Sequence, residues 1–427
     1  MGRQWVSRML ALAACAAMLP HASGQPCGEP GRLCAPPAPV TSAPQSVTPR
    51  IALLLPPGSD ALAEAADAVK SGFLAAREHD PAPAPYDVLD EGHDAATTRA
   101  AVATAAASHD ILIGPLSRSA IAALASAPAT REVRALRSTS DGRATEALPD
   151  PGHAPVPGSA PPTAGRLHIL LNTPPAGSQR LPPGTIPLGL VLEDEGRQAA
   201  NWASSDQPIG KALVVTGTDR WQIRLADTFT AAWRAPTRKA LRLKLDTSYS
   251  LISDSTLNEL PALLKAEHIT LIFAALNRDQ ARDLRRAVGT QMPFYGTSSL
   301  NPGPDPFLPT PELNGARIVD VPWQTTPPTD LKHSYYSGQT DLDRLYALGA
   351  DAYRLAKLLA TRPPEPVNYD GLTGHLVISP TQATVERTEA QAVYHMGTFQ
   401  PATGASTCGT ATAAPCRNTA TPGNNTP

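Results

Sequence analysis

Short aliphatic runs alternate with amphipathic stretches along most of the chain. The clearest run, 51–55, has five consecutive aliphatic residues, which is typical of a parallel strand buried on both faces. After it, apolar residues recur at spacings of four, three, four and three, which predicts a helix with one buried face: Leu62, Ala66, Val69, Phe73 and Ala76. Strands and helices in alternation indicate βαβ units and a parallel sheet.

The same alternation continues to the C-terminal quarter of the chain. In the first half it predicts strands at 86–90, 110–114 and 168–172 and helices at 97–108 and 121–125. In the second half it predicts strands at 212–216, 241–245, 269–276, 294–297 and 316–321 and helices at 221–232, 256–266, 281–288 and 345–359. From 371 to 399, apolar and polar residues alternate as they do in antiparallel strands.

The segment 186–203 connects the two halves. Residues 187–192 predict a strand, and Glu193, Asp194 and Glu195 follow in what we expect to be the first turn of a helix. Carboxylates at this position are stabilised by the helix dipole. We prefer this explanation to the alternative of a catalytic acid/base pair.

Size and composition limit the classes of protein. A chain of 427 residues exceeds the usual size of one core, so we expect two lobes. The 46 prolines concentrate at 36–49, at 149–162 and after 401, and we interpret 137–165 as a flexible insertion and 400–427 as a low-complexity tail. The net charge of −2 argues against binding nucleic acid, and no apolar run reaches the ~18 residues of a membrane span.

The N-terminus is typical of an exported protein. Residues 1–24 have the basic, apolar and small-residue regions of a signal peptide, followed by a proline-rich linker at 25–49. In an alternative reading, Leu12-Ala13-Ala14-Cys15 is a lipoprotein box, so that Cys15 would be lipidated and would tether the protein to the outer membrane. Either reading predicts a location in the periplasm.

The other four cysteines are Cys27, Cys34, Cys408 and Cys416. An even number of cysteines in an oxidising compartment favours two disulfides, with three possible connectivities. Neither pair has the spacing of a zinc site, and no histidine is close in sequence, so we prefer disulfides to metal binding.

Sequence motifs of catalysis are missing. The chain lacks the phosphate-binding loop, the dinucleotide-binding turn, the nucleophile elbow and the zinc helix, so we expect a non-enzymatic protein without cofactor or metal. Parallel sheets bind ligands beyond the carboxyl ends of their strands. Polar residues there are candidates for ligand binding, although capping of helices is the alternative for several of them: Ser59, Ser117, Ser119, Thr218, Asn277 and Ser298.

Four stretches resemble a known family: 188–203 (LGLVLEDEGRQAANWA), 294–301 (FYGTSSLN), 344–356 (RLYALGADAYRLA) and 371–376 (GLTGHL). They are similar to the C-terminal domain of the LppC/LpoA lipoproteins, which has the type I periplasmic-binding-protein fold. The resemblance implies an α/β protein with two doubly wound parallel-sheet lobes. One lobe would comprise 50–192 and 318–361, and the other 193–317 and 367–399.

The same resemblance implies a function. The family activates a class A penicillin-binding protein in peptidoglycan synthesis, so we expect such a synthase as the partner. The alternative is a solute-binding receptor that holds a small amino-acid-like or amide ligand in the cleft between its lobes. About 25 residues separate the predicted signal from the first strand, fewer than one 34-residue repeat, so we expect the helical-repeat domain of larger members to be absent.

Overall fold

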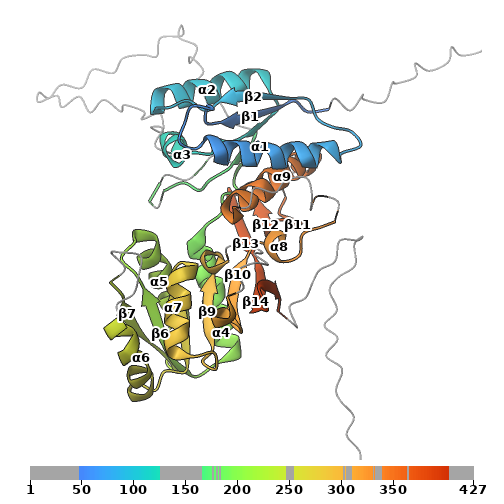
Figure 1. Ribbon diagram of the computed structural model, residues 1–427. Coiled ribbons are helices and arrows are strands. Elements are labelled where there is room, and N and C mark those ends of the chain that lie inside the picture. The colour runs from blue at the N-terminus through green and yellow to red at the C-terminus, as the bar shows by residue number, and fades with distance from the viewer. Residues whose placement is uncertain are drawn as a thin grey trace, which may run out of the picture. The chain divides into compact units, whose positions relative to one another are not determined.

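The computed structural model describes residues 48–125, 166–175, 177, 178, 181, 184–246, 254–301, 303, 310–329, 331, 339–362 and 365–402. Its strands form three sheets, two of them largely parallel and flanked by helices (Figure 1). The α/β fold with parallel sheets that the alternating pattern predicts is therefore confirmed. The predicted signal peptide, the insertion at 137–165 and most of the linker and tail lie outside the described residues, as do Cys15, Cys27, Cys34, Cys408 and Cys416.

The first sheet has five parallel strands in the order β2-β1-β3-β4-β5. They are β1 (Ile51–Leu55), β2 (Tyr86–Asp90), β3 (Ile111–Ile113), β4 (Leu167–Leu170) and β5 (Thr185–Pro187), with helices α1 (Ala63–Glu78), α2 (Ala95–Ser108) and α3 (Arg118–Ala125). All of β1 is buried, as its aliphatic run predicts. Leu53 packs in the cluster that contains α1, whereas Leu54 packs on the opposite side with Val102 of α2.

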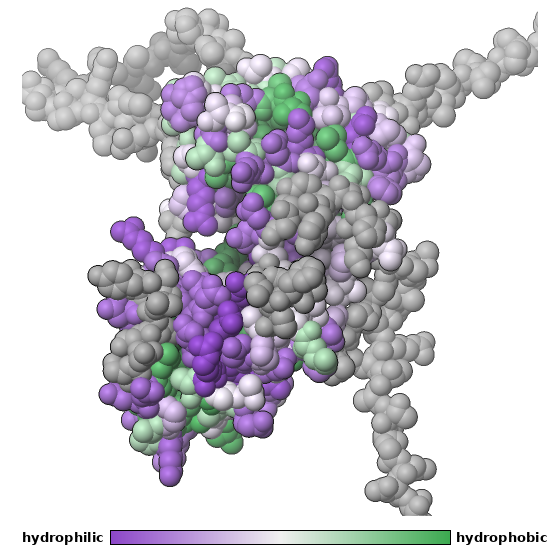
Figure 2. Space-filling model, in the orientation of Figure 1, coloured by the Kyte–Doolittle hydropathy of each residue, from purple (hydrophilic) through white to green (hydrophobic). Residues whose placement is uncertain are grey.

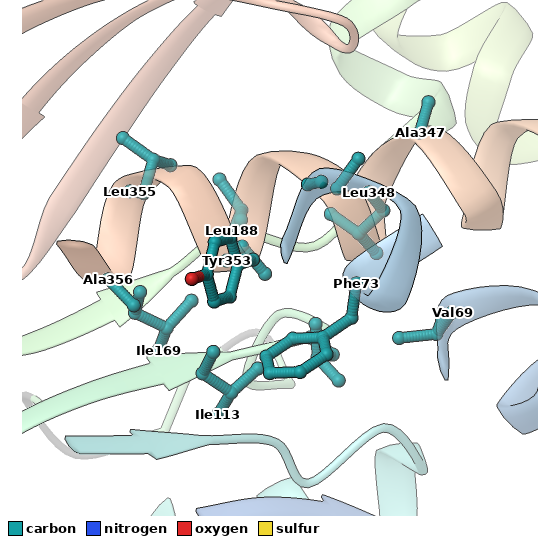
Figure 3. Close-up of a cluster of buried hydrophobic side chains, with 14 of the residues drawn as sticks. Val69, Phe73, Ile113, Ile169, Leu188, Ala347, Leu348, Tyr353, Leu355 and Ala356 are labelled. Carbon is teal, nitrogen blue, oxygen red and sulfur yellow. The ribbon is translucent and has the colours of Figure 1, made fainter. Parts of the chain in front are cut away.

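A helix from much later in the chain completes the first core. Helix α9 (Thr340–Ala360) packs against α1 and contributes Tyr346, Leu348, Tyr353 and Leu355 to the cluster. Figure 3 shows Leu348, Tyr353 and Leu355 interleaved with Phe73 of α1, Ile113 of β3 and Ile169 of β4. The rings of Phe73 and Tyr353 meet edge to face with centroids 5.1 Å apart.

Two glycines allow α1 and α9 to approach closely. A Cβ atom on Gly72 would lie 1.8 Å from the carbonyl oxygen of Tyr346, and one on Gly349 would lie 1.9 Å from that of Val69. Each glycine therefore faces the backbone of the other helix, where no side chain fits. The closeness of the two helices depends on both positions.

The second sheet has seven strands in the order β15-β14-β10-β9-β8-β6-β7. β14 pairs antiparallel with both of its neighbours, β10 and β15, and the other pairs are parallel. The strands are β6 (Gly210–Thr216), β7 (Arg238–Lys244), β8 (Leu271–Ala275), β9 (Phe294–Thr297), β10 (Ala316–Asp320), β14 (Ala390–His395) and β15 (Thr398–Pro401). One face is covered by α4 (Leu192–Asp206) and α5 (Arg220–Trp233), and the other by α6 (Asp254–Ala266) and α7 (Arg278–Val288). The short helices are η1 (Ser298–Leu300), η2 (Pro311–Leu313) and α8 (Pro322–Thr325).

The third sheet is antiparallel and consists of β11 (Val367–Gly371), β12 (Gly374–Ser379) and β13 (Thr384–Thr388). Its turn is fixed to α9 by buried Asp351, whose carboxylate accepts hydrogen bonds from Leu372 N at 2.9 Å and Thr373 N at 2.8 Å. A Cβ on Gly371 would lie 2.5 Å from Asp351 Oδ2. Position 371, the first glycine of the GLTG stretch, therefore has no room for a side chain beside the Asp351 carboxylate.

Two details differ from the predicted lobe boundaries. Val367, Leu376 and Ile378 are buried in the first core, not with the second sheet, because β11–β13 pack beneath α9. The boundary at 318 falls inside β10, which pairs with β9 and β14 and so belongs to the second sheet as a whole. Alternation within a strand indicates that one face is buried, but it does not identify the core that buries it.

The strand predicted at 187–192 is shorter than expected. β5 ends at Pro187, and Arg387 of β13 donates to the carbonyl oxygens of Leu188 at 2.5 Å and Gly189 at 2.9 Å. These two carbonyl oxygens thus accept hydrogen bonds from a side chain, where a longer β5 would pair with the backbone of a neighbouring strand. Among the described helices, none combines the length and apolar character required to cross a membrane.

Candidate functional site

The predicted ligand residues of the first sheet follow β1 and β3: Ser59 and half-buried Ser117 lie in loops, and exposed Ser119 is in the first turn of α3. Ser59 is exposed after β1. Ser117 precedes α3, accepts a hydrogen bond at its Oγ from Ala120 N at 3.2 Å, and lies 3.2 Å from Ser119 Oγ. The capping role considered for Ser117 is therefore present in the structure.

A buried carboxylate accepts the hydrogen bonds of the backbone N–H groups that precede α3. Glu91 is only 2% exposed, and its Oε2 accepts a hydrogen bond from Leu116 N at 2.6 Å while Oε1 accepts one from Ser117 N at 3.2 Å. Burial raises the pKa of Glu91, against the opposing effect of these hydrogen bonds. Backbone N–H groups at a helix start are favourable for an anionic ligand, but here they are bonded to the protein's own side chain.

The predicted ligand residues of the second sheet, Thr218, Asn277 and Ser298, differ in their surroundings. Asn277 is the N-cap of α7: its Oδ1 accepts from Gln280 N at 3.0 Å, and Gln280 Oε1 accepts from Asn277 N at 3.1 Å, which is a capping box and matches the capping alternative for this residue. Thr218 is exposed before α5. Of the six predicted residues, all of which the structure describes, Ser298 alone is buried.

Ser298 belongs to a buried polar group that we name the crossing cluster, which consists of Glu195, Ser298, Asp320, Arg344, Arg387 and Glu389. Ser298 N donates to Glu195 Oε2 at 2.7 Å, and Ser298 Oγ donates to Oε1 at 2.9 Å. Both oxygens of the Glu195 carboxylate are therefore bonded to one residue 103 positions away in the chain.

Asp320 and Arg344 form the ion pair of the cluster. Arg344 donates from Nε to Asp320 Oδ1 at 2.9 Å and from Nη2 to Oδ2 at 2.8 Å, a bidentate pair. Asp320 is fully buried and Arg344 is 7% exposed. Arg344 Nη2 also donates to the carbonyl oxygen of Ser298 at 3.1 Å, which joins the pair to Glu195.

The cluster lies where the chain passes between the first core and the second sheet. Glu195 is in the first turn of α4 after β5, Asp320 ends β10 before α8, and Glu389 connects β13 to β14. Glu389 N donates to Gln198 Oε1 of α4 at 2.8 Å. Each of the three segments that connect the first core with the second sheet therefore carries one of these buried carboxylates.

Burial perturbs the titration of this cluster. Burial raises the pKa of Glu195 well above its usual range, and the charges of Glu389 and Asp320 raise it further. Burial also raises the pKa of Glu389 to about 8, against the effect of Arg387, and among the described residues Glu389 Oε2 has no hydrogen-bond partner. Burial and the neighbouring negative charges thus favour the protonated form of both carboxyl groups.

The free energy of unfolding is expected to fall as the pH rises. A carboxyl group whose pKa is raised on folding stabilises the protein fully below its unfolded pKa of about 4.5, and this contribution is lost as pH increases toward about 8. One proton corresponds to at most about 1.4 kcal/mol per pH unit. Urea unfolding of wild type and Glu389→Gln between pH 5.5 and 8 should give a smaller slope for the variant. Equal slopes would contradict this assignment, and exposed Glu386→Gln is the control.

Sequence reasoning found Ser298 but missed its partner. We attributed Glu195 to the helix dipole, and α4 does begin at residue 192 with all three acidic residues in its first turn. Glu195 nevertheless lies on the buried face of α4 with Ala199 and Trp202, at spacings of four and three. That spacing was a signal in the sequence. Glu91 and Glu389 stand in loops without such periodicity, so no local pattern identifies them.

Comparisons with known proteins place this geometry in a family. The family model described as "LppC putative lipoprotein" matches residues 167–397, which include the second sheet except β15, and the crossing cluster. No match was found among the curated proteins. The family match confirms the resemblance that the four sequence stretches indicate.

Solved structures share the fold. A structure from Chromobacterium violaceum, described as a putative branched-chain amino acid ABC transporter, is 30% identical over 81% of this chain and 99% of its own, with a TM-score of 0.59. The C-domain of LpoA from Haemophilus influenzae, described as a regulator of PBP1A, is 20% identical over 83% of this chain and 99% of its own, with a TM-score of 0.59. Full-length LpoA from the same organism has a TM-score of 0.61 at 20% identity, over 84% of this chain and 59% of that protein.

Proposed function

The chain belongs to the LppC family, and on this premise we propose that it is a periplasmic protein that binds a class A penicillin-binding protein and raises its activity in peptidoglycan synthesis. The observation that carries the proposal is the family match over residues 167–397. The LpoA C-domain, described as a regulator of PBP1A, supports it through its common fold. The match spans 59% of full-length LpoA, so the proposal concerns the part of the function that resides in this domain.

We propose further that the protein acts by binding and not by catalysis. Two buried carboxylates are engaged in structural bonds: both oxygens of Glu195 accept from Ser298, and both oxygens of Asp320 accept from Arg344. Among the described residues, no group of three or more histidine, cysteine, aspartate or glutamate side chains could hold a metal ion. These features support a protein that presents surfaces to a partner.

The alternative of a solute-binding receptor has less support. Backbone N–H groups at a helix start are favourable for an anionic ligand. Here the N–H groups of Leu116 and Ser117 are already bonded to Glu91. A carboxylate ligand would have to displace a buried carboxylate of the protein, which disfavours amino-acid-like ligands in this loop.

Purified protein is expected to accelerate glycan polymerisation or cross-linking by the purified class A synthase of the same organism. The measurement follows the lipid-linked precursor and the cross-linked product with and without the protein. A heat-unfolded sample controls for nonspecific effects, and a monofunctional transpeptidase tests specificity for the partner class.

The receptor alternative predicts a different result. An amino acid or amide at a hundred times its dissociation constant should stabilise the protein by about 2.7 kcal/mol, which shifts its melting temperature. A ligand-dependent shift together with an unchanged synthase rate would reject the activator proposal.

A further inference from the structure

The first core has an apolar hollow at its edge. It has a volume of about 310 Å³ and lies beside α1 at the carboxyl ends of β1 and β2. Apolar residues form most of its wall, among them Leu55, Pro56, Ala66, Val88 and Leu89. Its size is at the lower end of the ~300–1,000 Å³ range of binding pockets, and it is large enough for one bulky side chain.

Exposed hydrophobic residues gather around this hollow. Val88, in its wall, is 43% exposed, and Leu62, next to the lining residue Ala63, is 39% exposed. Within the described part of the chain, the only other exposed large hydrophobic residues are Ile209, Val377 and Met396. Figure 2 shows hydrophobic surface over β2 and α1 bordered by hydrophilic residues. β2 is also an edge strand, because among the described strands it pairs only with β1.

The rim of the hollow is acidic. Asp67 and Asp90 line it, and Asp60 and Glu64 lie nearby in the loop and the first turn of α1, whereas Lys70 is the one cation in the lining. None of these five residues forms an ion pair with another described residue. Asp60 and Asp90 accept backbone hydrogen bonds from Leu62 and Gly92, and these bonds leave their charge in place. The surface is thus apolar at its centre and negative at its border.

We propose that this hollow is a docking site for an apolar side chain carried on a basic segment of the class A penicillin-binding protein. The inference rests on the proposed function and names the surface through which it acts. A buried apolar anchor supplies most of the affinity of such contacts, and complementary charges at the rim accelerate association. The described charged residues of the lining, Asp67, Lys70 and Asp90, are exposed or half-buried, which fits a protein partner better than an enclosed small polar ligand.

Gly58 offers a direct way to fill the hollow. Gly58 lines it, and a Cβ atom there would meet no other atom within 4 Å. Gly58→Trp should therefore fold normally, which its melting temperature checks, while it weakens binding to the synthase at least tenfold. Val88→Glu should have a similar effect because it places a charge in the apolar wall. The matched control is Ile209→Glu, since Ile209 is 72% exposed and lies in the bend before β6, away from the hollow.

The charged rim gives a kinetic readout. Surface-immobilised synthase and the full chain are used to measure association and dissociation rates at several salt concentrations. Asp67→Lys together with Asp90→Lys should slow association several-fold and flatten its dependence on salt, with a smaller effect on dissociation.

The outcomes separate this inference from the proposed function. If wild type binds and activates the synthase and all these variants do so equally well, the docking site is wrong and the function stands. If wild type does not bind the synthase, both are wrong. A melting shift with free amino acids that Gly58→Trp abolishes would reassign the hollow to a small ligand. Self-association that Val88→Glu abolishes would reassign it to a second copy of the chain.

Discussion

Arg344→Met is expected to lower the free energy of unfolding by about 3–5 kcal/mol. The substitution leaves the carboxylate of Asp320, which is fully buried, without its bidentate partner. It also removes the hydrogen bond to the carbonyl oxygen of Ser298. The carboxylate would keep hydrogen bonds from Asn301 Nδ2 and Val321 N, but no opposite charge would offset the hydration that it loses on burial. Urea unfolding monitored by circular dichroism measures the effect.

Two further variants identify the cause. Replacing both partners, as in Asp320→Leu with Arg344→Met, removes the unpaired charge and should recover part of the lost stability. Arg286→Met is the control at an exposed ion pair with Glu312, where the Arg286 side chain is 60% exposed and a loss of at most about 1 kcal/mol is expected. A double variant less stable than Arg344→Met would show that the ion pair is not the reason.

Gly349→Ala should destabilise the protein by roughly 3 kcal/mol or more, beyond the usual range for overpacking. The added Cβ would lie 1.9 Å from the carbonyl oxygen of Val69, a backbone atom that cannot rotate away. The helices α1 and α9 would have to separate, which loosens the contacts of Phe73 and Tyr353 between them. Guanidinium unfolding and the yield of folded protein are the measurements.

The direction of this effect distinguishes packing from helix propensity. In a helix without contacts, alanine is favoured over glycine by about 1 kcal/mol, so a loss of stability must come from the neighbouring helix. Gly72→Ala should behave like Gly349→Ala because its Cβ would lie 1.8 Å from the carbonyl oxygen of Tyr346. Gly58→Ala, with open space around the new atom, should change stability by less than about 1 kcal/mol. Similar small effects at all three glycines would contradict the close approach of the helices.

The sequence by itself determined the elements and their class. The continuous aliphatic run of β1, the capping box of α7 and the apolar stripe of α9 each depend on residues a few positions apart, and each is present in the structure. Local spacing is sufficient here because the periods of 2.0 and 3.6 residues are properties of the backbone itself. The four family-like stretches likewise needed only their own residues to indicate the family that the comparison confirms.

Tertiary structure alone decided which polar residues meet. Ser298 bonds to Glu195 across 103 positions, and Glu91 reaches Leu116 across 25, so no local spacing contains either pair. For the same reason the sequence does not show that β11–β13 are buried in the first core. Alternation indicates which face of a strand is apolar, but the surface that covers this face belongs to α9, a separate element. Burial then sets the chemistry, because a carboxylate at a helix start is stabilised when exposed to water, whereas burial and the charges of Glu389 and Asp320 raise the pKa of Glu195.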